Sequence, residues 1–275
     1  SPPPPPSPPP SPPSPPPLFL TSLVENPTQR KLYANDPEAS DFFGRSVSLY
    51  GDTALIGAYL DDDNQKSNSG SVYVFTRSSV DGTFTQQSKF YASDATANDR
   101  FGICVSLYGD TALIGAYKDD DNTKTDSGSV YVFTRSSSDG TFTQQSKFYA
   151  SDTTVSDEFG RSVSLYGDTA LIGAKVDDSV ISIVYVFTRP NADGTFTEQD
   201  TLNATDAKTN DNFGISVSLY GDTALIGAPG DDDNSQSASG SVYVFTRSST
   251  GGGTFTQQSK LHASDATAVD AFGSS

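Results

Sequence analysis

Three clusters of adjacent carboxylates are the residues of this sequence whose type and spacing could do chemistry. Each cluster reads Asp-Asp-Asp-Asn, and together they hold nine acidic side chains: Asp61, Asp62, Asp63, Asp119, Asp120, Asp121, Asp231, Asp232 and Asp233. Adjacent carboxylates need either full solvation or neutralisation by a hard cation. Two interpretations therefore stay open, namely solvated loops that add solubility and weak calcium sites. Calcium is the one cofactor that the sequence suggests.

Other reactive side chains are scarce. His262 is the one histidine, so neither a nucleophilic triad nor a zinc site can be assembled around it. Cys104 is the one cysteine and stands where the other repeats have serine, so we interpret it as a small residue of a strand. Carboxylates that recur from repeat to repeat in solvated loops do not suit acid–base catalysis. We therefore expect that the chain is not an enzyme.

Two segments carry candidate glycosylation sites. Asn203 lies in the one Asn-x-Thr sequon without proline at the middle position, and this sequon favours secretion. Residues 1–17, SPPPPPSPPPSPPSPPP, must form a polyproline II rod of roughly 50 Å, because proline fixes φ and lacks an N–H. Such blocks resemble the hydroxyproline-rich glycoproteins of plant and algal matrices. That resemblance implies hydroxylation and O-glycosylation of Pro2, Pro3, Pro4, Pro5, Pro6, Pro8, Pro9, Pro10, Pro12, Pro13, Pro15, Pro16 and Pro17. A plain spacer and a ligand for an aromatic groove are the alternatives.

The elements that position the acidic clusters repeat along the chain. The dodecapeptide VSLYGDTALIGA occurs four times, at residues 47–58, 105–116, 163–174 and 217–228. Phe-Gly pairs begin at Phe43, Phe101, Phe159, Phe213 and Phe272, with spacings of 58, 58, 54 and 59 residues. A period of this length is typical of a propeller or a solenoid.

One period contains four predicted strands. VSLY and TALIGA form a hairpin around a Gly-Asp turn, SVYVFTR follows the acidic loop, and TFTQQSKF completes the set. The sequence therefore predicts an all-β fold, a β-propeller of four-stranded antiparallel blades. We expect Gly57 and its copies to allow close backbone approach, and the Asp or Asn residues before each Phe-Gly to cap turns.

Phe-Gly followed by LIGA and SGSVYVF resembles the FG-GAP repeat of the integrin α-subunit head, over residues 29–275. The resemblance implies a propeller that serves in adhesion receptors, in other cell-surface proteins, or as a module attached to hydrolases. Calcium-binding integrin blades carry a DxDxDG-type loop in the first hairpin. Here Tyr-Gly-Asp-Thr closes that hairpin and is too short to wrap an ion, so the integrin calcium sites are not carried over.

Charge and hydropathy narrow the partners. With 34 acidic and 17 basic residues, the formal net charge is −17, which disfavours nucleic acid and anionic lipid as partners. No run of about 18 apolar residues is present, so we expect no membrane insertion.

The predicted organisation is a rod at residues 1–17, a linker at residues 18–28 and propeller repeats at residues 29–275. The fourth-strand motif occurs five times, first at residues 29–36, whereas the inner hairpin occurs four times, so one strand is surplus. Either more repeats follow Ser275 or the surplus strand pairs with another molecule. We expect an extracellular structural glycoprotein, a self-assembling subunit of a surface fibre, appendage or cell-wall matrix. The alternative is an adhesion module that binds a protein or glycan on the propeller face, and a targeting module cut from a hydrolase is the third possibility.

Overall fold

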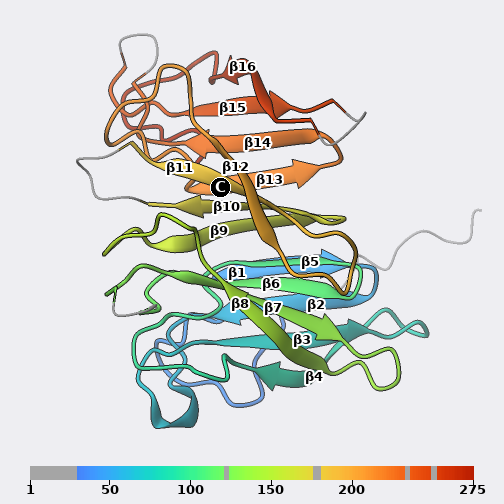
Figure 1. Ribbon diagram of the computed structural model, residues 1–275. Helices are drawn as coiled ribbons and strands as arrows, with labels where there is room; N and C mark the ends of the chain where they lie inside the picture. The colour runs from blue at the N-terminus through green and yellow to red at the C-terminus, as the bar shows by residue number, and fades with distance from the viewer. Residues whose placement is uncertain (1–29, 121–123, 176–180, 233–235, 249–252) are drawn as a thin grey trace, which may run out of the picture. The chain divides into compact units, whose positions relative to one another are not determined.

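The computed structural model describes residues 30–120, 124–175, 181–232, 236–248 and 253–275. The chain divides into two units, residues 1–32 and residues 33–275. Of the first unit only residues 30–32 are described, so the expected rod and linker lie outside the described residues. The second unit carries all the strands described here, and they form four antiparallel sheets of four strands each (Figure 1).

Each sheet takes its strands in chain order from one repeat. Sheet 1 contains β1 (Ser46–Tyr50), β2 (Thr53–Ala58), β3 (Ser71–Arg77) and β4 (Phe84–Phe90). Sheet 2 contains β5 (Val105–Tyr108), β6 (Thr111–Ala116), β7 (Ser129–Arg135) and β8 (Phe142–Phe148). Sheet 3 contains β9 (Phe159–Tyr166), β10 (Thr169–Ala174), β11 (Ile183–Thr188) and β12 (Thr197–Leu202). Sheet 4 contains β13 (Ser216–Tyr220), β14 (Thr223–Ala228), β15 (Ser241–Thr246) and β16 (Thr256–Leu261).

The repeated dodecapeptide forms the inner hairpin of each sheet, as predicted. In sheet 1, Tyr50 pairs with Thr53 across a two-residue turn in which Gly51 has a φ of +58°, a value that favours glycine. The turn residue Asp52 accepts a hydrogen bond from Arg77 Nε at 2.8 Å, which ties the hairpin to the end of β3. The same bond recurs in the other sheets, from Arg135 to Asp110, Arg189 to Asp168 and Arg247 to Asp222.

The Phe-Gly pair is needed where one sheet meets the next. Gly102 has a φ of +86°, and its carbonyl oxygen lies so close to Gly57 that a Cβ on Gly57 would sit 2.1 Å from it. Close backbone approach at Gly57 is therefore confirmed. The turn before the pair is capped as predicted, because Asp99 accepts hydrogen bonds from Thr96 N at 2.5 Å and Thr96 Oγ1 at 2.6 Å.

Consecutive sheets pack on one another through their inner strands, with β1 against β5, β5 against β9 and β9 against β13. A buried apolar cluster fills each of these three junctions. The four inner strands line an open hollow of about 390 Å³ with Ser46, Val105, Ser162 and Ser216. The prediction of an all-β, propeller-type fold is thus confirmed. Figure 1 shows sheets 1 and 4 at the two ends of the series.

The surplus fourth-type strand is not formed within the described part of residues 29–36. Residues 30–44 contain no strand, and none of the four described sheets includes them. The segment instead places Asp36 against Lys89 of β4 and Phe43 against Tyr73 of β3. In sheets 2 to 4, the segment that arrives from the preceding sheet makes the equivalent phenylalanine–tyrosine contact.

Candidate functional site

The first carboxylate of each described acidic loop lies buried against a lysine of the outermost strand. In sheet 2, Lys147 Nζ lies 2.6 Å from Asp119 Oδ2 and 3.1 Å from Asp94 Oδ2. The Tyr131 hydroxyl is 2.9 Å from Asp94 Oδ1 and 3.1 Å from Asp119 Oδ1, and Ser129 Oγ donates to Asp119 Oδ2 at 2.5 Å. One ammonium group thus balances two carboxylates. We call this arrangement the lysine–aspartate cluster.

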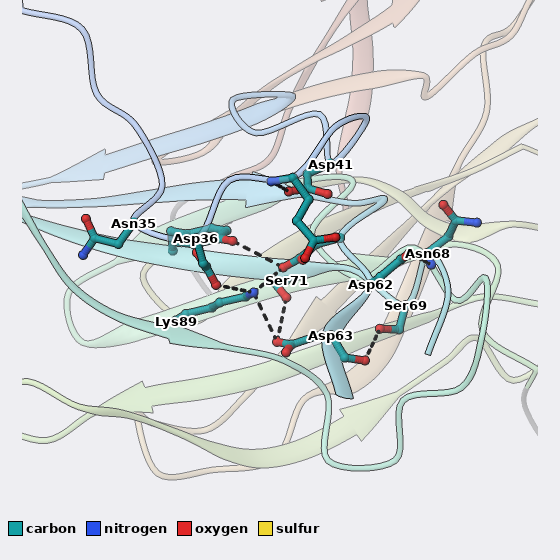
Figure 2. Close-up of polar contacts among 12 residues, drawn as sticks. Asn35, Asp36, Asp41, Asp62, Asp63, Asn68, Ser69, Ser71 and Lys89 are labelled. Atoms are coloured by element: carbon teal, nitrogen blue, oxygen red, sulfur yellow. Dashed lines mark hydrogen bonds and ion pairs between the residues drawn. The ribbon is translucent and has the colours of Figure 1, made fainter. Parts of the chain in front are cut away.

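Sheets 1 and 4 contain the same cluster. The distances from the lysine Nζ are 2.7 Å to Asp61 and 2.9 Å to Asp36 for Lys89, and 2.6 Å to Asp231 and 2.8 Å to Asp206 for Lys260. Figure 2 shows the cluster of sheet 1, in which Lys89 lies between Asp36 and Asp63, the latter 3.7 Å away. In sheets 2 and 4 the second aspartate, Asp94 or Asp206, lies in the segment that leads from the preceding sheet into this one. Each of these two clusters therefore joins two repeats.

The electrostatics of the cluster favour its charged form. Burial alone would raise the pKa of Asp94, but the hydrogen bonds from Lys147 and Tyr131 outweigh it and hold this pKa below its usual range. Burial alone would lower the pKa of Lys147, and the hydrogen bond and attraction of Asp119 raise it instead. Burial and the negative charge of Asp119 raise the pKa of Tyr131, so its hydroxyl stays protonated and can donate.

These contacts give the acidic loops a role that the sequence reading missed. Asp61, Asp119 and Asp231 are buried counter-ions of lysine instead of solvated loop residues. The second aspartate of each loop accepts a backbone N–H from the residue six positions later, in the pairs Asp62 with Asn68, Asp120 with Asp126 and Asp232 with Ala238. Asp63 accepts from Ser71 Oγ at 3.0 Å. Asp121 and Asp233 lie outside the described residues.

Calcium binding by these loops stays a prediction. Within the described ranges, no group of three or more His, Cys, Asp or Glu side chains is arranged to hold a metal ion. The lysine already supplies the positive charge that calcium would supply under the second of the two interpretations drawn from the sequence. A cation would therefore have to compete with an ammonium group for the first aspartate.

Sheet 3 shows the sequence signal that could have revealed the cluster. Thr201 of β12 stands where the other sheets have lysine. In the same repeat the acidic loop is four residues shorter and reads Asp177-Asp178-Ser179 in place of Asp-Asp-Asp-Asn. Lysine and the full acidic loop are thus present together or absent together. Tyr185 still donates to Asp152 Oδ1 at 2.9 Å. The loop aspartates of this repeat, Asp177 and Asp178, lie outside the described residues.

The remaining candidate positions are simply placed. Cys104 Sγ lies 3.0 Å from the Gly160 carbonyl oxygen. In the next repeat the hydroxyl of Ser162 makes the equivalent contact, with the Gly214 carbonyl oxygen. Burial raises the pKa of the Cys104 thiol to about 12. Asn203 is exposed and lies directly after β12. The prolines of residues 1–17 lie outside the described residues.

The two end sheets expose apolar side chains that the inner sheets bury. We call the outer side of sheet 1, with Val47 and Leu49, the leading face. These two side chains are 70% and 64% exposed, whereas their equivalents in sheet 2, Val105 and Leu107, are 8% and 5% exposed. On the opposite end, the trailing face of sheet 4 carries four partly or largely exposed residues, Ser218, Tyr220, Leu225 and Leu261. No described residue covers these faces as the neighbouring sheets cover theirs.

The sequence matches a family model described as FG-GAP repeat at residues 27–75, 84–133, 142–187 and 196–245. These matches cover well over half of the chain. The first match ends in β3, and each later match runs from the fourth strand of one sheet to the third strand of the next. The chain belongs to the FG-GAP repeat family. A search of curated proteins finds no significant match to the sequence.

Two solved structures are similar to the chain at low sequence identity. A protein from Lactobacillus plantarum is 14% identical with a TM-score of 0.46, and the match covers 78% of this chain and 52% of that one. A protein from Bacteroides uniformis described as a putative 6-phosphogluconolactonase is 10% identical with a TM-score of 0.54, and the match covers 81% of this chain and 57% of that one. The chain therefore spans little more than half the length of either protein.

The second of these structures corrects one expectation. We expected from the sequence that the chain is not an enzyme, yet a protein of this fold carries an enzyme's description. The expectation is therefore wrong as an inference from this repeat architecture, because the fold is compatible with catalysis. The likeness at this identity concerns the fold alone.

Proposed function

We propose that this chain is an extracellular structural glycoprotein that assembles with copies of itself into a surface fibre, appendage or cell-wall matrix. The observation that carries the proposal is the pair of apolar end faces. Leu49 at one end and Leu225 at the other belong to positions that are buried in every inner junction, and Val47 and Leu261 belong to positions that are buried or partly buried there. Apolar surface of this kind is stabilised by burial against another protein surface.

The net charge and the candidate glycosylation sites support an extracellular setting. The net charge of −17 keeps the surfaces of separate copies hydrated and dispersed until the end faces meet. Asn203 is exposed and can accept a glycan, and residues 1–17 have the composition of a stiff, glycosylated rod. Within the described residues, no helix has the length and apolar character to cross a membrane.

Material purified from its natural source tests this function. We expect filaments or sheets in negative-stain electron micrographs, and pentose or hexose masses on peptides that contain Pro2 to Pro17 and on the peptide of Asn203. Discrete monomers with unmodified prolines, recovered from inside the cell, would contradict the proposal. Monomers at the cell surface that capture a protein or a glycan would favour the adhesion alternative.

A further inference from the structure

We infer that the trailing face of one copy docks on the leading face of a second copy and rebuilds there the junction that already joins consecutive sheets. This inference rests on the proposed function and names the surface through which the copies would meet. The two faces are the two halves of one interface, since every inner junction pairs a surface equivalent to the trailing face with one equivalent to the leading face. An association of this kind is heterologous and repeats along an array.

The polar contacts of the inner junctions specify the register. The N–H of Leu107 donates to Ser48 Oγ at 2.9 Å, and the same bond joins Leu165 to Ser106 and Leu219 to Ser164. On the trailing face, Ser218 holds the serine position, and on the leading face, Leu49 holds the leucine position. Docking in register therefore pairs Leu49 N of the second copy with Ser218 Oγ of the first.

A row of tyrosines marks the same register. The rings of Tyr50 and Tyr108, Tyr108 and Tyr166, and Tyr166 and Tyr220 have centroids 5.2, 5.0 and 4.9 Å apart. The row stops at Tyr220, which is 77% exposed, and begins at Tyr50, which is 42% exposed. In the docked pair, Tyr220 of one copy continues the row onto Tyr50 of the next at the same spacing of about 5 Å.

Two segments compete for one place at the docked junction. In sheet 2 the connecting segment from sheet 1 packs Phe101 on Tyr131 and Phe133, with centroids 5.4 and 5.8 Å apart. In sheet 1 the chain's own Phe43 packs on Tyr73 and Phe75 in the same way. Phe272 is the equivalent residue after sheet 4, and it is 38% exposed, whereas Phe101 is fully buried.

The segment after sheet 4 is therefore a ready replacement for residues 33–44 of the next copy. Residues 263–273 and 33–44 share the motif of alanine, an aspartate two residues later and a terminal Phe-Gly. The later segment is anchored on its own sheet, because Ser216 Oγ donates to the Gly273 carbonyl at 2.8 Å and Phe272 N donates to Ser239 O at 2.9 Å. On docking, Phe272 enters the Tyr73 and Phe75 site of the second copy and residues 33–44 withdraw, which is an exchange of equivalent segments.

This exchange predicts that the same substitution at the two equivalent phenylalanines, Phe272 and Phe43, has opposite effects on the association of two copies. Phe272→Ser removes the incoming ring and should weaken association by at least about 100-fold in Kd. Phe43→Ser loosens the resident segment and should strengthen association or lower the concentration at which it begins. Leu49→Asp places a charge in the docked face and should weaken association as Phe272→Ser does, whereas Val80→Asp, at a position already 93% exposed, should leave it unchanged.

Sedimentation of the whole chain over a range of concentrations tests these variants, with circular dichroism to check that each one keeps its sheets. Photo-oxidative tyrosine cross-linking and peptide mass spectrometry should recover an intermolecular Tyr220–Tyr50 product, which Tyr220→Phe abolishes and Tyr91→Phe preserves. Association that is unaffected by Leu49→Asp and Phe272→Ser would overturn this interface while leaving self-assembly intact. A wild-type chain that stays monomeric at the highest concentration would overturn both, and would assign the faces to another occupant.

Discussion

At the scale of single residues, a partly buried lysine decides whether the acidic loops stabilise or destabilise the fold. Lys147→Met would leave Asp119 buried without its counter-ion, since this aspartate side chain is 5% exposed. We expect the free energy of unfolding to fall by about 3–5 kcal/mol, measured by chemical denaturation. Lys208→Met, at an exposed position, is the matched control and should change stability little.

The double variant Lys147→Met with Asp119→Leu measures the interaction between the two side chains apart from the effect of each single substitution. The double variant lacks both the ammonium group of Lys147 and the carboxylate of Asp119, so no unpaired charge is left buried at this position. Most of the stability lost in Lys147→Met should therefore return. A double variant as unstable as the sum of the two single variants would contradict the assigned pairing.

The buried turn cap Asp99 gives the fold a pH dependence of known sign. Burial raises the pKa of Asp99 from 3.8 to about 6, against the opposing hydrogen bonds from Thr96. The folded state therefore binds this proton more tightly than the unfolded chain, so the contribution of Asp99 to stability falls as the pH rises from about 4 to about 6. The loss is on the order of 2–3 kcal/mol. Asp99→Asn should remove this loss, and stability curves of wild type and variant that run parallel across this range would count against it.

Cys104 shows how one position can accept two side chains for the same bond. Because the pKa of its thiol is about 12 and its sulfur faces the Gly160 carbonyl, we expect no reaction with thiol reagents at pH 8 until the chain unfolds. Cys104→Ser should be close to neutral, since the other repeats make this bond with serine, and Cys104→Ala should cost about 1 kcal/mol. Rapid labelling of the folded chain would contradict this assignment.

At the scale of the elements, the junction between sheets depends on the absence of one Cβ. A Cβ on Gly115 would lie 2.0 Å from the Gly160 carbonyl oxygen, a backbone atom that cannot rotate away. We expect Gly115→Ala to cost about 3 kcal/mol or more by forcing sheets 2 and 3 apart. Gly140→Ala is a useful comparison, because Gly140 has a φ of +75° and open space around it, so backbone strain alone should cost about 1–2 kcal/mol. Equal losses in the two variants, measured by thermal unfolding, would contradict the role of close approach.

The elements themselves were predictable from the sequence, whereas their polar contacts were not. Alternation in VSLY and TALIGA, with glycine and aspartate between them, specifies the hairpin locally. The lysine–aspartate cluster joins Lys147 to Asp94, 53 residues away, and local patterns carry no information about such a contact. Comparing the repeats would have helped, because the one repeat with Thr201 in place of lysine also has the shortened loop.

At the scale of the whole molecule, identical sequences lie in different environments. Val47 and Val105 both begin the same dodecapeptide, yet one is exposed and the other is buried, because within the described part of the chain only Val105 has another sheet packed against it. The sequence could not distinguish them. It also predicted a surplus strand at residues 29–36, whereas the described residues from 33 onward form no strand there and place Asp36 against Lys89 of sheet 1. The exposed faces of sheets 1 and 4 can be recognised only once the packing of consecutive sheets is known.

The most direct test of the account is electron cryomicroscopy of the whole chain at a concentration where it associates. We predict that sheet 4 of one copy packs on sheet 1 of the next as consecutive sheets pack within a copy, with Phe272 in the Tyr73 and Phe75 site and the tyrosine row continued from Tyr220 to Tyr50. Copies that meet through other surfaces, or separate particles whose end faces remain uncovered, would contradict it.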